Sequence, residues 1–130
     1  GHTARLSGKN CVELTTDSSL PRYRMVGGDY NSLRKFVSSR EWLVKADRAG
    51  RWSFAASRNK GGVPAGYVLE IDGIQSQFIL PEAKRQQSWQ SQAIELKAGQ
   101  LVIVRLRSIS PGGELLEGGL SCKFVPVSGK

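Results

Sequence analysis

The stretch from Gly50 to Ser108 is built of short segments in which apolar and polar residues alternate, separated by turn residues and without helical periodicity. Trp52, Phe54 and Ala56 share one side of such a segment, as a half-buried strand requires. Between two further segments stands Asp72-Gly73, which favours a two-residue hairpin because a type I′ turn needs positive φ at both central positions. The stretch therefore predicts an antiparallel, all-β fold.

Flanking segments extend the same pattern in both directions. Residues 33–37 fit either one or two helical turns or another strand, and the sequence leaves both alternatives open. Turns at the observed spacings are typical of a β-sandwich or jelly roll, so about eight or nine short antiparallel strands are expected. The length of 130 residues suits a single domain over 1–130. Within it, residues 1–9 are expected to be flexible or derived from a tag.

The chain is basic, and its charge is uneven. It has 19 Lys and Arg against 11 Asp and Glu, a formal net charge of +8. Residues 1–60 hold 12 basic and 5 acidic side chains and so carry +7 of that charge. A basic half can attract nucleic acid, an anionic polysaccharide or an anionic membrane surface, and the alternative is a basic face that is simply solvated.

Residues that commonly carry catalysis are scarce. His2 is the single histidine, which argues against a catalytic triad with a histidine base and against a histidine-based zinc site. No glycine motif that would hold phosphate precedes a helix, and the close carboxylates Glu114 and Glu117 lie in a glycine-rich loop. The chain is therefore expected not to be an enzyme. No apolar run approaches the roughly 20 residues that span a bilayer.

The two cysteines, Cys11 and Cys122, lie in strand-like segments near opposite ends of the chain. Because the terminal strands of a β-sandwich are often neighbours, a disulfide between them is expected, and two free thiols are the alternative. Closing so long a loop would stabilise the fold by roughly 4–5 kcal/mol in the chain-entropy model. A disulfide would also indicate an oxidising compartment, so a secreted, periplasmic or cell-surface location is expected.

Three segments, read together, resemble the β-sandwich carbohydrate-binding modules of families 6 and 35, which are galactose-binding-like jelly rolls. The turns at Asp72-Gly73 and Ala98-Gly99 also resemble lectin domains of the anthrax protective-antigen type. The resemblance implies a module that binds glycan without catalysis. The three segments are Glu41–Phe54 with its turn at Gly50, Tyr67–Gly73, and Trp89–Gly99.

The resemblance also implies where a sugar would bind. Tyr30 matches the place of one stacking aromatic, while Gln86 stands where these modules often have another. Trp89 corresponds to a buried tryptophan of the family. No cofactor is expected. These modules often have a calcium site near the first strand, but Glu13 lacks the acidic companion that such a site would need, so a structural calcium ion is not predicted and the question of a metal stays open. The candidate ligand-binding residues are Tyr30, Arg58, Asn59, Lys60, Lys84, Arg85 and Gln86.

The basic half favours an acidic glycan, gripped by charge-assisted hydrogen bonds from these loops. Two other functions stay open. One is a protein–protein adhesion or assembly module of a secreted or cell-surface complex, since two expected sugar contacts are missing. Gln86 replaces an aromatic residue, and the final loop has Glu117-Gly118-Gly119 where these modules often have an asparagine or aspartate. The other is nucleic-acid binding through the basic surface, although the aromatic residues occupy alternating, core-type positions.

Overall fold

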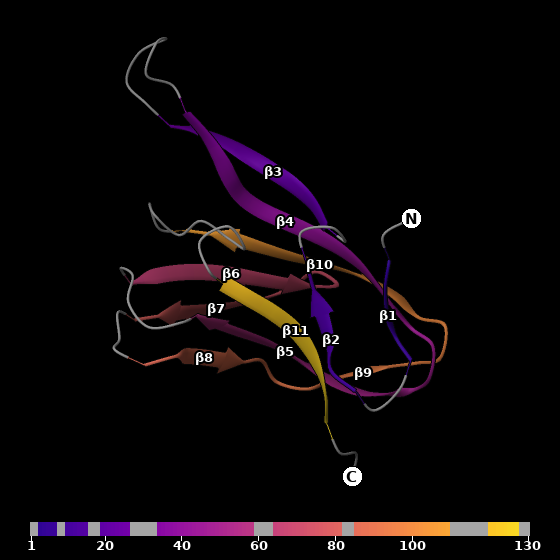
Figure 1. Cartoon of the computed structure of the whole chain (residues 1–130). Helices are drawn as coiled ribbons and strands as arrows, with labels where there is room; N and C mark the ends of the chain where they lie inside the picture. The colour runs from indigo at the N-terminus through magenta and orange to yellow at the C-terminus, as the bar shows by residue number, and fades with distance from the viewer. Residues whose placement is uncertain are drawn as a thin grey trace.

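The computed structural model describes residues 3–7, 10–15, 19–26, 34–58, 64–81, 85–109 and 120–127. Its described residues form eleven strands in two sheets, which confirms the expected all-β jelly-roll sandwich (Figure 1). The strand number exceeds eight or nine because three of the strands are only three residues long. No described segment is a helix long and apolar enough to cross a membrane. The strands are β1 (Ala4–Leu6), β2 (Val12–Leu14), β3 (Ser19–Val26), β4 (Arg34–Ala46), β5 (Gly50–Arg58), β6 (Ala65–Ile71), β7 (Ile74–Leu80), β8 (Gln87–Gln90), β9 (Ile94–Leu96), β10 (Leu101–Ser108) and β11 (Leu120–Val127).

The chain passes repeatedly between the two sheets, with β3–β4, β6–β7 and β8–β9 each consecutive within one sheet. The first sheet has the order β1-β4-β10-β6-β7, with β3 also paired to β4. The second has the order β2-β11-β5-β8, with β9 also paired to β5. All pairs are antiparallel except β1 and β4, which run parallel. The 50–108 stretch thus supplies strands to both layers.

The core lies between the sheets and follows the alternation seen in the sequence. In β10 every second residue is buried, so Val102, Val104 and Leu106 point inward. Phe54 and Phe124, which are paired across β5 and β11, meet edge to face with ring centroids 6.1 Å apart. Such burial of large apolar side chains is the main favourable term in folding a chain of this size.

The hairpin at residues 72–73 forms as expected. Asp72 has φ 51° and Gly73 has φ 84°, both in the left-handed region. Ile71 pairs directly with Ile74, so the loop contains two residues. Asp72-Gly73 therefore sets the register of β6 against β7.

Residues 34–37 are strand, which excludes the helical alternative for them. They belong to β4 and pair with β3 over Tyr23–Val26. β10 pairs only with Ser39–Lys45 of β4, so β3 and the start of β4 continue as a two-stranded ribbon beyond the rest of the sheet (Figure 1).

Within residues 1–9, which the sequence predicts to be flexible or derived from a tag, Ala4–Leu6 are strand. These residues form β1 on the edge of the first sheet. Ala4 and Leu6 are both buried, and Leu6 has no exposed surface. Apolar side chains at alternate positions hold this short strand against the core. Gly1, His2, Gly8 and Lys9 lie outside the described residues.

Candidate functional site

A groove with a volume of about 590 Å³ lies on the outer face of the second sheet. Its floor is low because β5, a strand inside the sheet, contributes only the small residues Ala55, Ala56 and Ser57 to the lining. Ser121 of β11 pairs with Ser57 on one side, and Ser88 of β8 pairs with it on the other. Three hydroxyl groups therefore form one row across the groove, each able to donate and accept hydrogen bonds.

A second row crosses the groove next to the serines. It consists of Glu13, Lys123, Ala55 and Gln90, which are paired in that order through β2, β11, β5 and β8. The row supplies a carboxylate, an ammonium group and an amide around one methyl group. Both charged residues and the amide are exposed. The groove therefore offers donors and acceptors on both sides of an uncrowded floor.

Ser91 fixes the wall of the groove that β8 forms. Its hydroxyl oxygen accepts a hydrogen bond from the backbone N–H of Phe54 at 2.9 Å, and its own backbone N–H donates to the carbonyl of Phe54 at 2.8 Å. The hydroxyl also donates to the carbonyl of Gln92 at 3.0 Å. These bonds hold the residue that follows Gln90 to the middle of the sheet, so the amide wall is positioned before any ligand arrives.

Arg58, one of the predicted ligand-binding residues, is buried. Its guanidinium donates to the carbonyls of Leu80 at 3.1 Å and Pro81 at 3.0 Å. It thereby ties the end of β5 to the end of β7. Burial raises the pKa of the neighbouring Tyr67 hydroxyl, and the positive charge of Arg58 partly offsets this effect. A direct contact between Arg58 and a ligand stays a prediction.

Arg85 and Gln86 lie close to the same end of the second sheet. Both are exposed, and they immediately precede Gln87, which pairs with Arg58. Gln86 lines the groove. Of the predicted ligand-binding residues that the structure describes, Gln86 lines the groove, Arg85 precedes it in the chain, and Arg58 has its side chain buried on the inward side of β5. Tyr30, Asn59, Lys60 and Lys84 lie outside the described residues.

The sequence did not single out most of the residues that line the groove. Ser57, Ser88, Gln90, Ser121 and Lys123 are polar or small side chains at the outward positions of alternating strands. Such residues are common on any solvated face, so only the pairing of β2, β11, β5 and β8 reveals them as a group. Among the residues that the structure describes, no cluster of His, Cys, Asp and Glu could hold a metal ion.

The expected disulfide is not present. Cys11 is free and exposed beside the groove, whereas Cys122 is free and buried in the core. Cys122 pairs with Leu14, three residues along the chain from Cys11. Three residues span roughly 10 Å of strand and reverse the direction of the side chain, whereas a disulfide needs Cα atoms within about 6.8 Å. The terminal strands are neighbours as expected, but the two thiols are out of register.

Searches against protein-family models and against curated proteins found no match. Solved structures with a similar fold include two family 35 carbohydrate-binding modules. The module from Clostridium thermocellum has a TM-score of 0.55 at 15% identity, covering 88% of this chain and 97% of that chain. The module from Cellvibrio japonicus has a TM-score of 0.52 at 19% identity, covering 93% of this chain and 95% of that chain.

A larger protein contains the same fold. A β-glucosidase from Paenibacillus barengoltzii matches with a TM-score of 0.56 at 16% identity, over 95% of this chain. The chain spans only 11% of that enzyme's length. At these identities the likeness establishes a shared fold: the chain has the jelly-roll architecture of family 35 carbohydrate-binding modules.

Proposed function

We propose that the chain is a non-catalytic carbohydrate-binding module that holds a glycan in the groove on its second sheet. The observation that carries the proposal is the lining of this groove. Hydroxyl, amide, carboxylate and ammonium groups surround a floor of small residues, within a hollow of about 590 Å³. Binding pockets for small ligands have volumes of about 300–1,000 Å³ and a few well-placed polar groups. The likeness in fold to carbohydrate-binding modules supports the same function.

An acidic glycan fits the charges best. Lys123 stands within the groove, and Arg85 is exposed next to Gln86 at its end. A uronate or sulfate group on the sugar could accept charge-assisted hydrogen bonds from either side chain. Glu13, at the opposite end of its row, would accept hydrogen bonds from sugar hydroxyls. Tyr30, Asn59, Lys60 and Lys84 complete the proposed contacts as the loop residues that the sequence predicts.

The proposal implies a secreted, periplasmic or cell-surface location, where polysaccharides are met. Because both cysteines are free, no disulfide supports that location. Fractionation of the source cells would test it: the proposal expects the protein outside the cytoplasm.

Affinity electrophoresis through gels that contain single polysaccharides tests the function. The panel pairs acidic polymers, such as polygalacturonate and glucuronoxylan, with neutral mannan and unsubstituted xylan. We expect acidic polymers to retard the protein, less so at high salt because screening weakens exposed charge pairs, and Tyr30→Ala to reduce the retardation. If no polymer retards the wild-type chain, the proposed function is wrong. If neutral polymers retard it equally, only the preference for acidic sugars is wrong.

A further inference from the structure

A second hollow, of about 370 Å³, lies on the outer face of the first sheet, on the side of the sandwich away from the groove. The strands β4, β10, β6 and β7 lie side by side there and present two outward rows of side chains, two residues apart along β10. The first row is Glu41, Arg105, Glu70 and Gln75, and the second is Ser39, Arg107, Val68 and Gln77. All of these residues except the last line the hollow.

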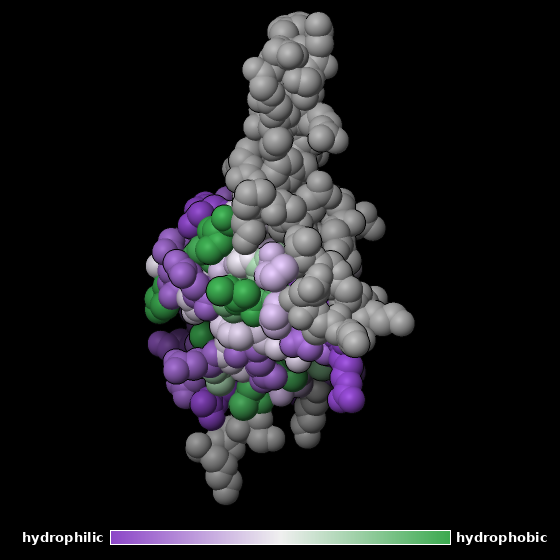
Figure 2. Space-filling model, turned by 90° about the vertical axis from the view of Figure 1, so that its left-hand side faces the viewer, coloured by the Kyte–Doolittle hydropathy of each residue, from purple (hydrophilic) through white to green (hydrophobic). Residues whose placement is uncertain are grey.

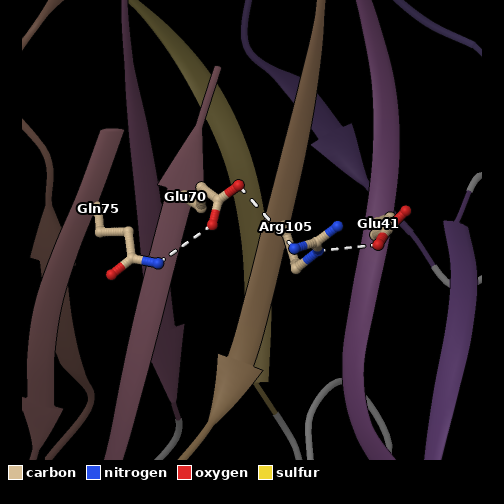
Figure 3. Close-up of polar contacts among 4 residues, drawn as sticks. All are labelled: Glu41, Glu70, Gln75 and Arg105. Carbon is tan, nitrogen blue, oxygen red and sulfur yellow. Dashed lines mark hydrogen bonds and ion pairs between the residues drawn. The ribbon is translucent and has the colours of Figure 1, made fainter. Parts of the chain in front are cut away.

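The first row is fixed by its own polar contacts (Figure 3). Arg105 Nε donates to Glu41 Oε2 at 2.8 Å, and Arg105 Nη1 lies 3.9 Å from Glu70 Oε2. Gln75 Nε2 donates to Glu70 Oε1 at 3.2 Å. The second oxygen of Glu41 takes part in none of these contacts. The row therefore holds carboxylate oxygens in place as hydrogen-bond acceptors at one side of the hollow.

The second row contains two donors that the chain itself does not use. Arg107 is exposed and forms no ion pair or hydrogen bond within the part of the chain that the structure describes. Ser39, which pairs with Arg107 across β4 and β10, is only 7% exposed and lines the hollow. Its hydroxyl likewise forms no hydrogen bond with any described residue. Because buried polar groups are normally hydrogen-bonded, this hydroxyl points to an acceptor from outside the chain.

Apolar residues limit the size of the polar surface. Val68 is 4% exposed but does not belong to the core cluster between the sheets, so it forms an apolar floor under the hollow. Leu43 and Ile103 lie beyond the first row, and Ile79 and Ile109 lie beyond the second. Figure 2 shows hydrophobic residues in separate patches among hydrophilic ones on the side that it faces. The polar surface is thus confined to two rows roughly 7 Å apart, which suits a small molecule better than a polymer along the strands.

We propose that this hollow binds a small hydroxy acid, a molecule with one carboxylate and several hydroxyl groups. The carboxylate accepts hydrogen bonds from the guanidinium of Arg107 and the hydroxyl of Ser39, and the bonds from the guanidinium are charge-assisted. The hydroxyl groups of the ligand donate to Glu41 and Glu70 in the first row. Its carbon chain lies on Val68. The volume of about 370 Å³ is within the range of small-ligand sites, about 300–1,000 Å³.

The charges favour an anion with neutral donors over a cation or a dipolar ion. The hollow contains two carboxylates and two guanidinium groups and so has no net charge of its own, whereas the chain carries +8. The field of the whole chain therefore favours an anion. Arg105 already neutralises much of the charge of Glu41 and Glu70. Their remaining lone pairs suit hydroxyl groups better than a second cation.

Titration of the whole chain with D-gluconate, followed by ¹H–¹⁵N NMR, tests the proposal. A ligand of this size at ordinary ligand efficiency has a dissociation constant on the order of 1 mM. We expect saturable shifts of the amide signals around Ser39 and Arg107, and none around Ser57 and Ser121 in the groove. Glucitol, which lacks the carboxylate, and acetate, which lacks the hydroxyl groups, should each bind at least about tenfold more weakly.

Substitutions of Arg107 separate its charge from its shape. Arg107→Met keeps much of the apolar stem and removes the guanidinium, so gluconate should bind at least about tenfold more weakly. Arg107→Lys keeps the charge without the planar fork and should recover only part of the loss. Lys45→Met removes one positive charge from the same face outside the hollow and is the matched control, expected to bind like the wild type. The spectra of the variants also show whether each one is folded.

Several outcomes would overturn the proposal. They are the absence of saturable shifts up to about 20 mM gluconate, shifts that centre on the groove, equal binding of glucitol or acetate, and equal losses in Arg107→Met and Lys45→Met. The site does not rest on the proposed glycan binding, because the two hollows lie on opposite faces. Ser57→Trp, which fills the groove, should bind gluconate like the wild type, so failure of one site is distinguishable from failure of the other.

Discussion

Phe78 of β7 and Trp89 of β8 stack across the two sheets, with ring centroids 4.3 Å apart and planes inclined by 7°. The two strands lie at corresponding edges of different sheets, so this pair closes the sandwich on one side. Tyr67 stacks on Phe78 with centroids 5.1 Å apart and extends the aromatic column inward. Since Gln90 and Ser88 flank Trp89 on the outer face, the same column supports one wall of the groove.

Removing the middle ring of this column should destabilise the fold strongly. Phe78 is 4% exposed, and Phe78→Ala is expected to lower the free energy of unfolding by about 3–5 kcal/mol through lost burial and the cavity left behind. Urea denaturation followed by tryptophan fluorescence measures this change. Ile79→Ala, at an exposed position next in the chain, should change it by less than about 0.5 kcal/mol. Equal effects of the two substitutions would contradict the assigned core.

Arg58 should matter for stability through the two carbonyls that it binds. Arg58→Met keeps much of the apolar stem but leaves the carbonyls of Leu80 and Pro81 without their donor, and about 2 kcal/mol should be lost, as for other hydrogen bonds to charged groups. Arg58→Lys should recover part of the loss. Arg51→Met, on the same strand and less buried, is the control in the same denaturation experiment. An unchanged unfolding free energy for Arg58→Met would show that these hydrogen bonds contribute nothing.

Stability should fall at alkaline pH because of Cys122. Burial raises the pKa of its thiol from 9.0 to about 12. Between these values the unfolded chain loses the thiol proton while the folded chain keeps it. The stabilisation is therefore complete below pH 9 and is lost as pH rises toward 12, at up to about 1.4 kcal/mol per pH unit. Tyr67, whose pKa burial also raises, adds to the loss. Unfolding free energies measured over this range should show a shallower slope for Cys122→Ala than for Cys11→Ala.

The two thiols should differ in reactivity. Cys11 is exposed and should react with an alkylating reagent in the native protein, whereas Cys122 should react only after denaturation. Mass spectrometry without a reducing agent counts the modifications in each state. One modification in the native state and two after denaturation are expected. A protein that takes up none until it is reduced would contain a disulfide and contradict the structure.

Local features of the fold could be predicted from the sequence because neighbouring residues determine them. Asp72-Gly73 defines the β6–β7 hairpin through its own backbone preferences, and the alternation of Phe54 and Ala56 defines the buried side of β5. The pairing of β5 with β11 joins segments more than 60 residues apart, as in Ser57 with Ser121, and no local pattern specifies it. The groove depends on this pairing, so it could not be predicted.

The sequence contains a signal that Arg58 is buried. Arg58 has the same parity as Phe54 and Ala56 along one strand, so continued alternation places it on the buried side. Its charge and its position before a loop suggested a ligand contact instead. A buried charged group needs hydrogen-bond partners, and Arg58 finds one in the carbonyl of Leu80. Whether Cys11 and Cys122 lie close together depends on the register between β2 and β11. The alternation of residues within each segment does not determine that register.

Isothermal titration of a polysaccharide fragment into Ser57→Trp is the most direct test of whether glycan binds in the groove of the second sheet. An indole at Ser57 would fill the hollow from its floor while pointing away from the core. Gln77→Trp adds the same side chain to the outer face of the first sheet and is the matched control. We expect Ser57→Trp to raise the dissociation constant at least about tenfold, a change of roughly 1.4 kcal/mol, and Gln77→Trp to bind like the wild type. Wild-type affinity in Ser57→Trp would contradict this expectation and place the ligand elsewhere.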